Sequence, residues 1–580
     1  MLALLSCRPP APAAAPGESV VHDALYFVLV DRFNNADPSN DLDARVDDPQ
    51  AWHGGDLAGV RAKVDYLADL GVGAVWLSPI TASQHRAVGE WGAFHGYWVN
   101  DHRAVEPRFG TVQDARDLRD ALHARGMGLY LDMVWNHAGY DAPLVTERPG
   151  WFHNLGDVVE WDDPVEAVTH DVHGLPDLRQ EDPKVHTYLR DASEWWIREV
   201  EPTGFRVDAV RHLPSGFVRR ISDELRARHP GFVLLGEHFE GDPHALAARY
   251  RSDRLDAVFD FPMHYAMKDV FCSDAPVGRI ASTLAADRAY GAPPGASGPG
   301  LVPFLDNHDV PRIASACHGD LDRVARALAF MITTRGTPCI YQGTEVGQLG
   351  SQEPANRADM AFDAQHPLAE TLRGLLALRA RHAVLRDGVT RIEALGPDHL
   401  LYSRITASAV ARIAVNTGPE PWTPPVPTDQ AEFEPSAQWL VTGTGPLTAS
   451  EGGAVPPAAV RVDLLHGNAR ALRDITIPGA TDRATLSIIA EGAPATPGDR
   501  VLLVGAGEAL GGWSPARGVP ARRTARGWMW TLDVAQGDVL AFKIVVDGPD
   551  GTRWSPGPDR YAWAHAANDR LVMPWDLPPG

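Results

Sequence analysis

The 580-residue chain places carboxylates at the ends of short apolar runs, where charged side chains are unusual. Asp208 closes the run GFRVD and follows Arg206 by two residues. A carboxylate that leaves water at such a place costs free energy unless something compensates the lost hydration. Asp208 is therefore either paired with Arg206 for structural reasons or held ready for chemistry. Taken alone, this stretch favours the structural interpretation.

Several other apolar runs end in the same kinds of residue. Their polar ends contain Asp132, Asn136, His137, His212, Glu237, Asp306, Asn307, His308 and Asp309. Three or more carboxylates on one rim repel each other, so structural need alone would not gather them there. If the fold brings these ends together, the set indicates a reactive site.

The elements that must position these residues follow a regular order between about residues 21 and 385. Short apolar runs alternate there with amphipathic stretches, which is typical of a parallel α/β fold. The eight runs lie at 25–30, 73–78, 128–134, 204–208, 232–237, 255–261, 301–306 and 337–341. We therefore predict a closed (β/α)8 TIM barrel, in which the chemistry sits at the carboxyl ends of the strands.

One helix signal and one long connection refine this prediction. In residues 111–126, Thr111 and Asp114 approximate a capping box, and Gly126 ends the pattern. Residues 137–183, after the third run, are rich in Asp, Gly, Pro and aromatic residues. An insertion of that length usually has a function, so we predict an inserted subdomain there.

The remaining chain divides into segments of different composition. Residues 1–20 read as a leader and tether, and 21–385 as the barrel with its insertion. Residues 386–476 predict an all-β domain of short strands and Pro/Gly-rich turns. Residues 477–580 predict a C-terminal β-sandwich, which holds six of the 17 tryptophans.

Charge and targeting signals limit the partners. The formal net charge of −22 argues against nucleic acid or an anionic membrane as a partner. No run of 18 apolar residues suggests a membrane-spanning segment. The start, MLALLSCRPP, resembles a clipped lipoprotein signal, so we expect a secreted or extracytoplasmic protein, anchored through a lipid on Cys7. The alternative is a disordered leader with an incidental cysteine. Cys272, Cys317 and Cys339 are too few and too scattered for a disulfide framework or a metal cluster, and Cys339 fits a core position.

The strand-end motifs carry a family resemblance. The segments DMVWNH, GFRVDAVRH, GEHF and FLDNHD, in that order, resemble the four best-known sequence regions of the α-amylase family of glycoside hydrolases. GVGAVWLSPI, LPDL at 175–178 and GTPCIYQGTE agree with further segments of that family. The resemblance spans residues 24 to about 385, and seven motifs in family order argue strongly against coincidence.

By that resemblance, three carboxylates are catalytic. Asp208 matches the nucleophile, Glu237 the general acid/base, and Asp309 the carboxylate that stabilises the transition state. Retaining glycosidases need one carboxylate ionised and another protonated at first encounter. We expect Arg206 to keep Asp208 charged and neighbouring carboxylates to raise the pKa of Glu237.

The resemblance also implies residues that bind sugar rings. Tyr97 matches an aromatic that stacks beneath the sugar at the cleaved bond, and Glu353 and Arg357 resemble a donor-side clamp. Phe239 matches an acceptor-side aromatic of cyclodextrin-forming members, whereas Arg211 stands where α-amylases usually carry lysine. The full implied set is Tyr97, His95, Trp98, His137, Arg206, Arg211, Phe239, His308, Glu353 and Arg357. For the histidines and Tyr97, the alternative is an ordinary structural role.

Two groups of oxygen-bearing residues resemble family sites for Ca²⁺, a cation that takes six to eight oxygen ligands. The first consists of Asn136, Asp177 and the His212 carbonyl, and it would tie the insertion to the barrel. The second consists of Asn35, Asp37, Asn40, Asp41, the Gly54 carbonyl and Asp56. A turn rich in Asn and Asp also forms without metal, which is the alternative for both.

The last hundred residues resemble a starch-binding domain through VLLVGAGEALGGWSP, FKIVVDG and RWSPGPDR. Trp513 and Trp554 would stack on glucose rings, whose C–H faces are apolar, and Lys543 would bond a hydroxyl. Asp559 stands where that family usually has asparagine. The alternative is that both tryptophans belong to the core.

Together these residues predict a Ca²⁺-dependent, endo-acting α-1,4-glucan hydrolase that acts on starch and related α-glucans as a monomer. A maltogenic or cyclodextrin-forming glucanotransferase activity is the first alternative. The LPDLRQEDPKV segment offers no aromatic of the kind that cyclodextrin-forming members use to guide a chain. A catalytically silent glucan-binding protein is the second alternative.

Overall fold

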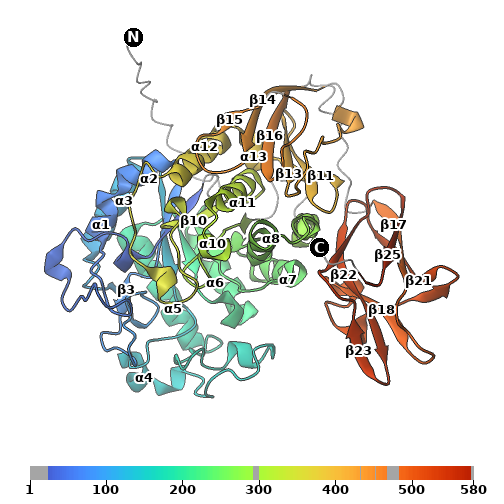
Figure 1. Cartoon of the computed structure of the whole chain (residues 1–580). Coiled ribbons are helices and arrows are strands. Elements are labelled where there is room, and N and C mark those ends of the chain that lie inside the picture. Colours follow the sequence, from blue (N-terminus) through green and yellow to red (C-terminus); the bar gives the residue numbers. More distant parts are fainter. Residues whose placement is uncertain (1–23, 292–299, 431–432, 451, 467–481, 577–580) are drawn as a thin grey trace, which may run out of the picture.

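The computed structural model describes residues 24–291, 300–430, 433–450, 452–466 and 482–576. The predicted leader with Cys7 and the predicted border near residue 476 lie outside these ranges. Along the chain, a helix-rich barrel is followed by an antiparallel sheet and then by a β-sandwich (Figure 1).

Eight parallel strands form the barrel, as predicted. They are β1 (Leu25–Val28), β2 (Ala74–Leu77), β5 (Gly128–Met133), β6 (Gly204–Val207), β7 (Val233–Gly236), β8 (Ala257–Phe259), β9 (Leu301–Val302) and β10 (Cys339–Tyr341). Their order is β10-β1-β2-β5-β6-β7-β8-β9. The sheet closes between its edge strands, because the Cys339 N–H donates to the Pro303 carbonyl at 2.8 Å and Phe304 forms a parallel bridge with Cys339. The carboxyl ends of all eight strands therefore meet on one rim.

Amphipathic helices cover the barrel. They are α1 (Leu57–Ala62), α2 (Val64–Leu70), α3 (Val112–His123), α5 (Pro183–Val200), α6 (Ser215–Arg228), α7 (Pro243–Asp253), α8 (Phe261–Cys272), α9 (Gly278–Ala285), α10 (Ile313–Ala316), α11 (Leu321–Thr333), α12 (Pro367–Arg381) and α13 (Ala383–Asp387). The capping box predicted for α3 is present, with the Asp114 carboxylate accepting from the Thr111 N–H at 2.9 Å. Gly126 follows with a φ of 72°, which favours glycine.

Two excursions from the barrel rim position the polar residues. After β2, the hairpin of β3 (Thr81–Ser83) and β4 (Val99–Val105) carries the FHGYW segment that contains Tyr97. After β5, residues 137–183 hold α4 (Pro143–Glu147) and several single turns. A bridge from His137 to Asp177 pairs the two ends of this second excursion, and one from Phe152 to Leu178 pairs its middle with its end.

The C-terminal part is all-β. A six-stranded antiparallel sheet contains β11 (Val389–Leu395), β12 (His399–Ile405), β13 (Val410–Asn416), β14 (Glu434–Val441), β15 (Thr448–Ala449) and β16 (Ala459–His466). Two further sheets form the sandwich from β17 (Arg483–Glu491), β18 (Arg500–Gly505), β19 (Val519–Pro520), β20 (Arg522–Thr524), β21 (Gly527–Ala535), β22 (Val539–Gly548), β23 (Gly551–Trp554), β24 (Arg560–Trp563) and β25 (Asn568–Pro574). Trp530 and Trp575 are buried in the sandwich core. The sandwich contacts the barrel through Arg288 and Asp538, 3.3 Å apart.

A disulfide joins Cys272, the last residue of α8, to Cys317, directly after α10. The sequence analysis excluded a disulfide framework and did not predict this single bond, because the 45-residue separation hides the proximity of the two cysteines in the fold. Cys339 is a free, buried thiol, which confirms its predicted core position. Within the described ranges, no helix is both long and apolar enough to cross a membrane.

We expect the double substitution of Cys272 and Cys317 by Ser to lower the free energy of unfolding by about 2–4 kcal/mol, because the open chain gains conformational entropy when unfolded. Chemical unfolding of both proteins measures the difference. Substitution of the free Cys339 by Ala serves as the control for losing a cysteine without losing a cross-link. Equal unfolding with and without reductant in the wild-type protein would contradict the assignment.

Candidate active site

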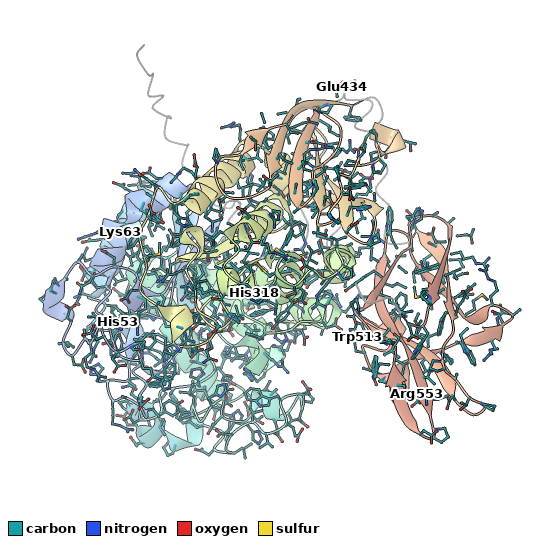
Figure 2. All side chains as sticks on the ribbon, viewed as in Figure 1. His53, Lys63, His318, Glu434, Trp513 and Arg553 are labelled. Atoms are coloured by element: carbon teal, nitrogen blue, oxygen red, sulfur yellow. A yellow bond between two sulfur atoms is a disulfide. The ribbon has the colours of Figure 1, made fainter. Side chains whose placement is uncertain are left out.

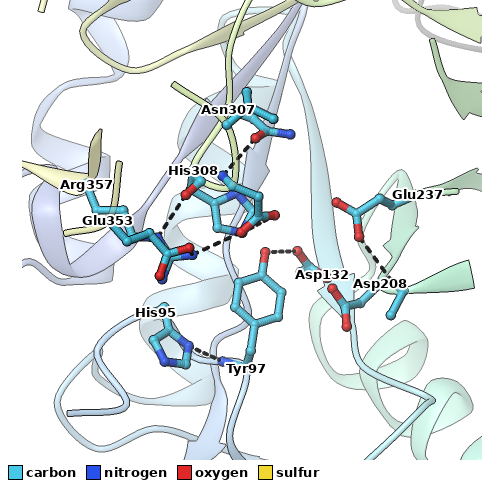
Figure 3. Close-up of polar contacts among 12 residues, drawn as sticks. His95, Tyr97, Asp132, Asp208, Glu237, Asn307, His308, Glu353 and Arg357 are labelled. Carbon is cyan, nitrogen blue, oxygen red and sulfur yellow. Dashed lines mark hydrogen bonds and ion pairs between the residues drawn. The ribbon is translucent and has the colours of Figure 1, made fainter. Parts of the chain in front are cut away.

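The guanidinium of Arg206 lies at the centre of the barrel rim and is fully buried. Its Nη1 lies 3.0 Å from both Asp132 carboxylate oxygens and 2.8 Å from Asp208 Oδ1. Its Nη2 contacts Glu237 Oε1. These carboxylates end the neighbouring strands β5, β6 and β7, so the parallel register brings them around one cation. Figure 3 shows the three carboxylates facing the same space.

A tight turn after Asp208 supports Glu237. Ala209 has φ 48° and ψ 40°, in the left-handed region that costs a non-glycine residue about 1–2 kcal/mol. This conformation lets the Ala209 N–H donate to Glu237 Oε2 at 3.2 Å, while the Val210 N–H donates to the Glu237 carbonyl at 2.7 Å. The chain therefore tolerates local strain where it fixes the two carboxylates predicted to be catalytic.

Two of the carboxyl groups around Arg206, those of Glu237 and Asp132, hold protons more tightly than usual. Burial raises the pKa of Glu237 to about 8, and the charges of Asp208, Asp309 and Asp132 add to it against the opposing effect of Arg206. Burial also raises the pKa of Asp132 to about 7, again opposed by Arg206. The direction for Glu237 agrees with the sequence expectation, but burial is a larger cause than the neighbouring carboxylates. The charge of Arg206 does not offset the desolvation of these two carboxyl groups, so both retain protons near neutral pH.

Asp309 has a different environment. Burial alone would raise its pKa, but His308, Arg357 and Arg206 lower it below the ordinary value. Arg357 Nη2 lies 2.9 Å from Asp309 Oδ1 and 2.6 Å from Glu353 Oε1, so the predicted donor-side clamp is joined to Asp309. The site therefore pairs a carboxylate that stays ionised with a carboxyl that keeps its proton.

Aromatic and imidazole rings surround these carboxylates. The Tyr97 hydroxyl donates to Asp132 Oδ2 at 2.9 Å, and its ring stacks on His308 with centroids 5.1 Å apart (Figure 3). His95 Nδ1 accepts from the Tyr97 N–H at 3.1 Å. Trp98 is nearly buried, edge-on to the His95 ring. His137 Nε2 donates to the Tyr97 carbonyl at 3.1 Å, and burial lowers the pKa of His137, which favours its neutral form.

Two predicted substrate-binding residues lie outside this cluster, and some structural contributors were missed. Arg211 bonds the backbone carbonyl of Phe239 rather than any of the carboxylates around Arg206.

The sequence analysis placed Asp132 at the rim but assigned it no role, although Trp76 Nε1 also donates to it at 3.1 Å. Asn356 was missed as well, and its amide donates to the His308 and Val310 carbonyls. No motif signalled Asn356, because its partners lie about 46 to 48 positions away.

The first predicted calcium group has the oxygen atoms that a hard cation needs. Asn136 Oδ1 and Asp177 Oδ1 are buried, and neither has a hydrogen-bond partner among the described residues. The Leu178 N–H donates to the Asn136 carbonyl at 2.9 Å, which keeps the two segments together. Unpaired buried oxygens are costly, and a cation would satisfy both. These two residues therefore fit Ca²⁺.

The second predicted group fits less well. The Asp56 carboxylate accepts from the Gly59, Ala36 and Asp37 N–H groups, and so caps α1. Asp41 Oδ1 accepts from Asn35 Nδ2 at 2.7 Å, beside Gly54. Only the Asn40 side-chain oxygen is both buried and unpartnered among the described members of this group. Internal hydrogen bonds thus account for most of this loop without a metal.

The residues predicted to bind starch lie on the sandwich surface rather than in its core. Trp554 is 39% exposed on β23. Trp513 is half-buried with a φ of 62° and lies at the edge of the sandwich nearer the barrel (Figure 2). Lys543 Nζ donates to the Gly557 carbonyl at 2.7 Å. The alternative that both tryptophans are buried in the core therefore does not hold.

Comparison with known proteins matches both parts of the chain. The family model described as "Alpha amylase, catalytic domain" matches residues 27–149 and 144–374, and the model described as "Starch binding domain" matches 487–571. The solved structure of an α-amylase from Geobacillus thermoleovorans, complexed with acarbose, superposes with a TM-score of 0.68 at 31% identity. That match covers 78% of this chain and 100% of the other.

Curated relatives carry several different activity names. A beta/alpha-amylase of Paenibacillus polymyxa is 34% identical over 63% of this chain, but the matched part is only 31% of that protein. A cyclomaltodextrinase of Geobacillus thermopakistaniensis is 28% identical, over 73% of this chain and 72% of that protein. A cyclomaltodextrin glucanotransferase of Klebsiella oxytoca is 27% identical, over 70% and 72%.

Replacing Arg206 with Met should lower the free energy of unfolding by about 3–5 kcal/mol at pH 7, because the buried carboxylates lose their shared cation. Glu237 and Asp132 have folded pKa values of about 8 and about 7, above those of the unfolded chain. Their contribution to stability therefore falls as pH rises from about 4 to about 8. We expect the free energy of unfolding to fall more steeply with pH in the variant than in the wild type, so the difference between the two proteins should be smaller at pH 5 than at pH 7. Urea unfolding at both pH values measures this difference.

The matched control is Arg219→Met, because Arg219 is exposed on α6. This control should change stability little at either pH. The prediction fails if Arg206→Met loses no more stability than the control, or if its loss does not depend on pH. Either result would show that the charge of Arg206 does not offset the cost of burying these carboxylates.

Proposed function

Because the chain belongs to the α-amylase family of glycoside hydrolases, we propose that it hydrolyses internal α-1,4-glucosidic bonds of starch and related α-glucans with retention of configuration. The observation that carries this proposal is the set of carboxylates around Arg206. Asp208 and Glu237 share that guanidinium from adjacent strands, while Asp309 is kept ionised by Arg357 and His308. Retaining glycosidases use two neighbouring carboxyl groups, one as the nucleophile and one as the acid/base.

In the first step, a carboxylate oxygen of Asp208 attacks the anomeric carbon of the sugar. The bond from that carbon to the glycosidic oxygen breaks, and Glu237 gives its proton to the departing oxygen. In the second step, water attacks the same carbon and gives its proton to Glu237, and the bond to Asp208 breaks. The raised pKa of Glu237 suits it to begin as the acid, since it is protonated at neutral pH.

The other residues of the cluster would bind and orient the sugar. Tyr97 offers a ring braced by His308, and its hydroxyl is fixed by Asp132. Asp309 would stabilise the positive charge that develops on the sugar ring, and Arg357 positions it. His137 and His308, both with pKa values lowered by burial, would hydrogen-bond hydroxyls as neutral rings.

Endo-hydrolysis is the finer part of the proposal. The likeness to an α-amylase structure over 78% of the chain supports it, as does the lack of an aromatic residue in LPDLRQEDPKV. Phe239 favours the alternative of cyclodextrin-forming or maltogenic activity, because it is 37% exposed next to the Glu237 strand end. The names of the relatives include both kinds of activity. All three catalytic candidates are present, which disfavours a silent glucan-binding protein.

We also propose a Ca²⁺ ion held by Asn136 and Asp177, with the His212 carbonyl as a further ligand. When bound, the ion would join the excursion at 137–183 to the barrel and would take no part in the chemistry. An extracytoplasmic location is consistent with the Cys272–Cys317 disulfide, since such bonds persist in oxidising compartments. The sandwich, with Trp513 and Trp554, would hold the enzyme on starch.

The purified protein should release reducing ends from soluble starch, and Glu237→Gln should lower this rate by at least about 10³-fold because the amide cannot donate the proton. Binding to starch granules should be unchanged, since it rests on the sandwich. Glu147→Gln, an exposed substitution on the excursion, is the control for the chemical change alone.

Chromatography of the products from long amylose separates the finer alternatives. Mixed linear products would support endo-hydrolysis, whereas cyclic or maltose-only products would replace it with the first alternative. Granule binding by the wild type without any release of reducing ends would overturn the enzymatic proposal.

Chelation should lower the thermal unfolding midpoint of the wild type by several degrees. An ion present at a hundred times its dissociation constant stabilises the folded state by about 3 kcal/mol, and chelation removes this stabilisation. Asp177→Ala should be insensitive to chelator, because one of its oxygens is a proposed ligand. Asp41→Ala, in the second group, should retain the sensitivity of the wild type. A midpoint that does not change when the wild type is chelated would exclude a structural ion.

A further inference from the structure

A groove runs between helix α12 of the barrel and the six-stranded sheet, and none of the residues that line it belongs to the candidate active site. Six residues of α12, Trp439 of β14 and the loop before β15 form its walls. Figure 1 shows α12 next to β14 and β15. The groove has a volume of about 410 Å³, and pockets that bind small ligands have volumes of about 300–1,000 Å³. Its size therefore suits a short oligosaccharide.

One face of α12 forms the long wall of the groove. Glu370, Gly374, Ala377 and Arg381 follow one another at helical spacing, which places them on a single stripe of the helix. Glu370 and Arg381 stand at the two ends of this stripe, about 16 Å apart along the helix axis. Between them, Gly374 has no side chain and Ala377 has only a methyl group. The helix therefore presents a low middle between two charged ends.

The sheet and the loop before β15 supply the apolar part of the groove. Trp439 is half-buried, and the His382 ring lies tilted against it with centroids 5.7 Å apart. Leu447 packs over Gly374, where a Cβ atom would lie 2.9 Å from Leu447 Cγ, and this close approach accounts for a glycine inside a helix. Leu378 is a buried lining residue. A partly exposed indole that a neighbouring ring supports offers a stable face to apolar C–H groups.

The charged ends of the stripe are not used by the fold. Glu370 and Arg381 are both exposed, and the side chain of neither forms a hydrogen bond or an ion pair with another described residue. Arg373, between them, differs, because it donates to the Asp69 carbonyl at 3.2 Å and to the Ala364 carbonyl at 2.9 Å. One carboxylate and one guanidinium are therefore available to a ligand.

These two groups favour a neutral ligand that carries hydroxyls. The carboxylate of Glu370 repels anions at one end of the groove, and the guanidinium of Arg381 repels cations at the other. Glu370 can only accept hydrogen bonds and Arg381 can only donate them, whereas a hydroxyl does both and can bind at either end. A glucose ring combines such hydroxyls with an apolar C–H face that suits the Trp439 indole.

We propose that this groove is an additional, non-catalytic binding site for a short stretch of α-glucan. Trp439 stacks on a glucose ring, and Glu370 and Arg381 bind hydroxyls. The identity of the ligand rests on the proposed function, because the barrel and the sandwich would bring the protein to α-glucans. A further attachment point would raise the local concentration of polymer around the enzyme.

Maltotriose binding to the full chain carrying Glu237→Gln, Trp513→Ala and Trp554→Ala tests the site. Hydroxyl-radical footprinting measures the oxidation of Trp439 itself, so maltotriose bound in the active-site cleft does not affect the result. We expect maltotriose to protect Trp439 from oxidation in a saturable manner. Cellotriose, which joins the same units through β-1,4 bonds, should protect it less, because this linkage places the hydroxyls differently.

Adding Glu370→Ala and Arg381→Ala to the same chain should raise the maltotriose concentration for half-protection about tenfold, since hydrogen bonds to two charged groups are lost. Both side chains are exposed and unpaired, so their removal should leave the fold intact. Glu434→Ala, an exposed substitution on β14 outside the groove lining, is the matched control and should leave this concentration unchanged.

Three results would overturn the inference. Trp439 oxidation that does not respond to maltotriose excludes the site, and equal protection by cellotriose excludes its assignment to α-glucans. An effect of the Glu370 and Arg381 substitutions no larger than that of Glu434→Ala removes their proposed role.

The same experiment separates this inference from the proposed function, because it uses a chain that lacks the acid/base and needs no cleavage. If the wild type releases no reducing ends from starch but Trp439 is protected, the proposed hydrolysis fails and the binding site stands. If the wild type cleaves starch but Trp439 is not protected, only the binding site fails.

Discussion

The buried guanidinium of Arg206 is the contact on which the rest of the site depends. Three carboxylates from three adjacent strands share it, and burial makes their full ionisation costly. The barrel makes this arrangement possible, because parallel register places Asp132, Arg206 and the end of β7 at the same height. Burial raises the pKa of Glu237 against the effect of Arg206, whereas His308, Arg357 and Arg206 together lower that of Asp309.

The excursions exist to complete this rim. Strand ends alone supply the carboxylates, but the hairpin after β2 supplies Tyr97, and the segment after β5 supplies Asp177. Each excursion is held to the rim by contacts from the barrel loops, such as the Arg211 bond to the Trp161 carbonyl. The carboxylates and the aromatic residues of the rim are thus divided between the rigid sheet and the loops that it holds.

The sandwich adds a separate way of holding the polymer. Trp530 and Trp575 pack in its core, whereas Trp513 and Trp554 lie at its surface. The ion pair of Arg288 and Asp538 places this domain against the barrel. An enzyme that cuts an insoluble polymer gains from such a second attachment, because binding at one site raises the local concentration at the other.

The sequence alone determined the eight strands, their order of motifs and the identity of the rim residues, because alternating apolar runs and turn signals are local properties. Tertiary structure decided what depends on contacts between distant segments. The Cys272–Cys317 bond was missed for this reason, and so was the link of Trp161 to Arg211. The cause of the Glu237 pKa also needed the fold, since sequence indicates neighbouring charges but not the burial that outweighs them.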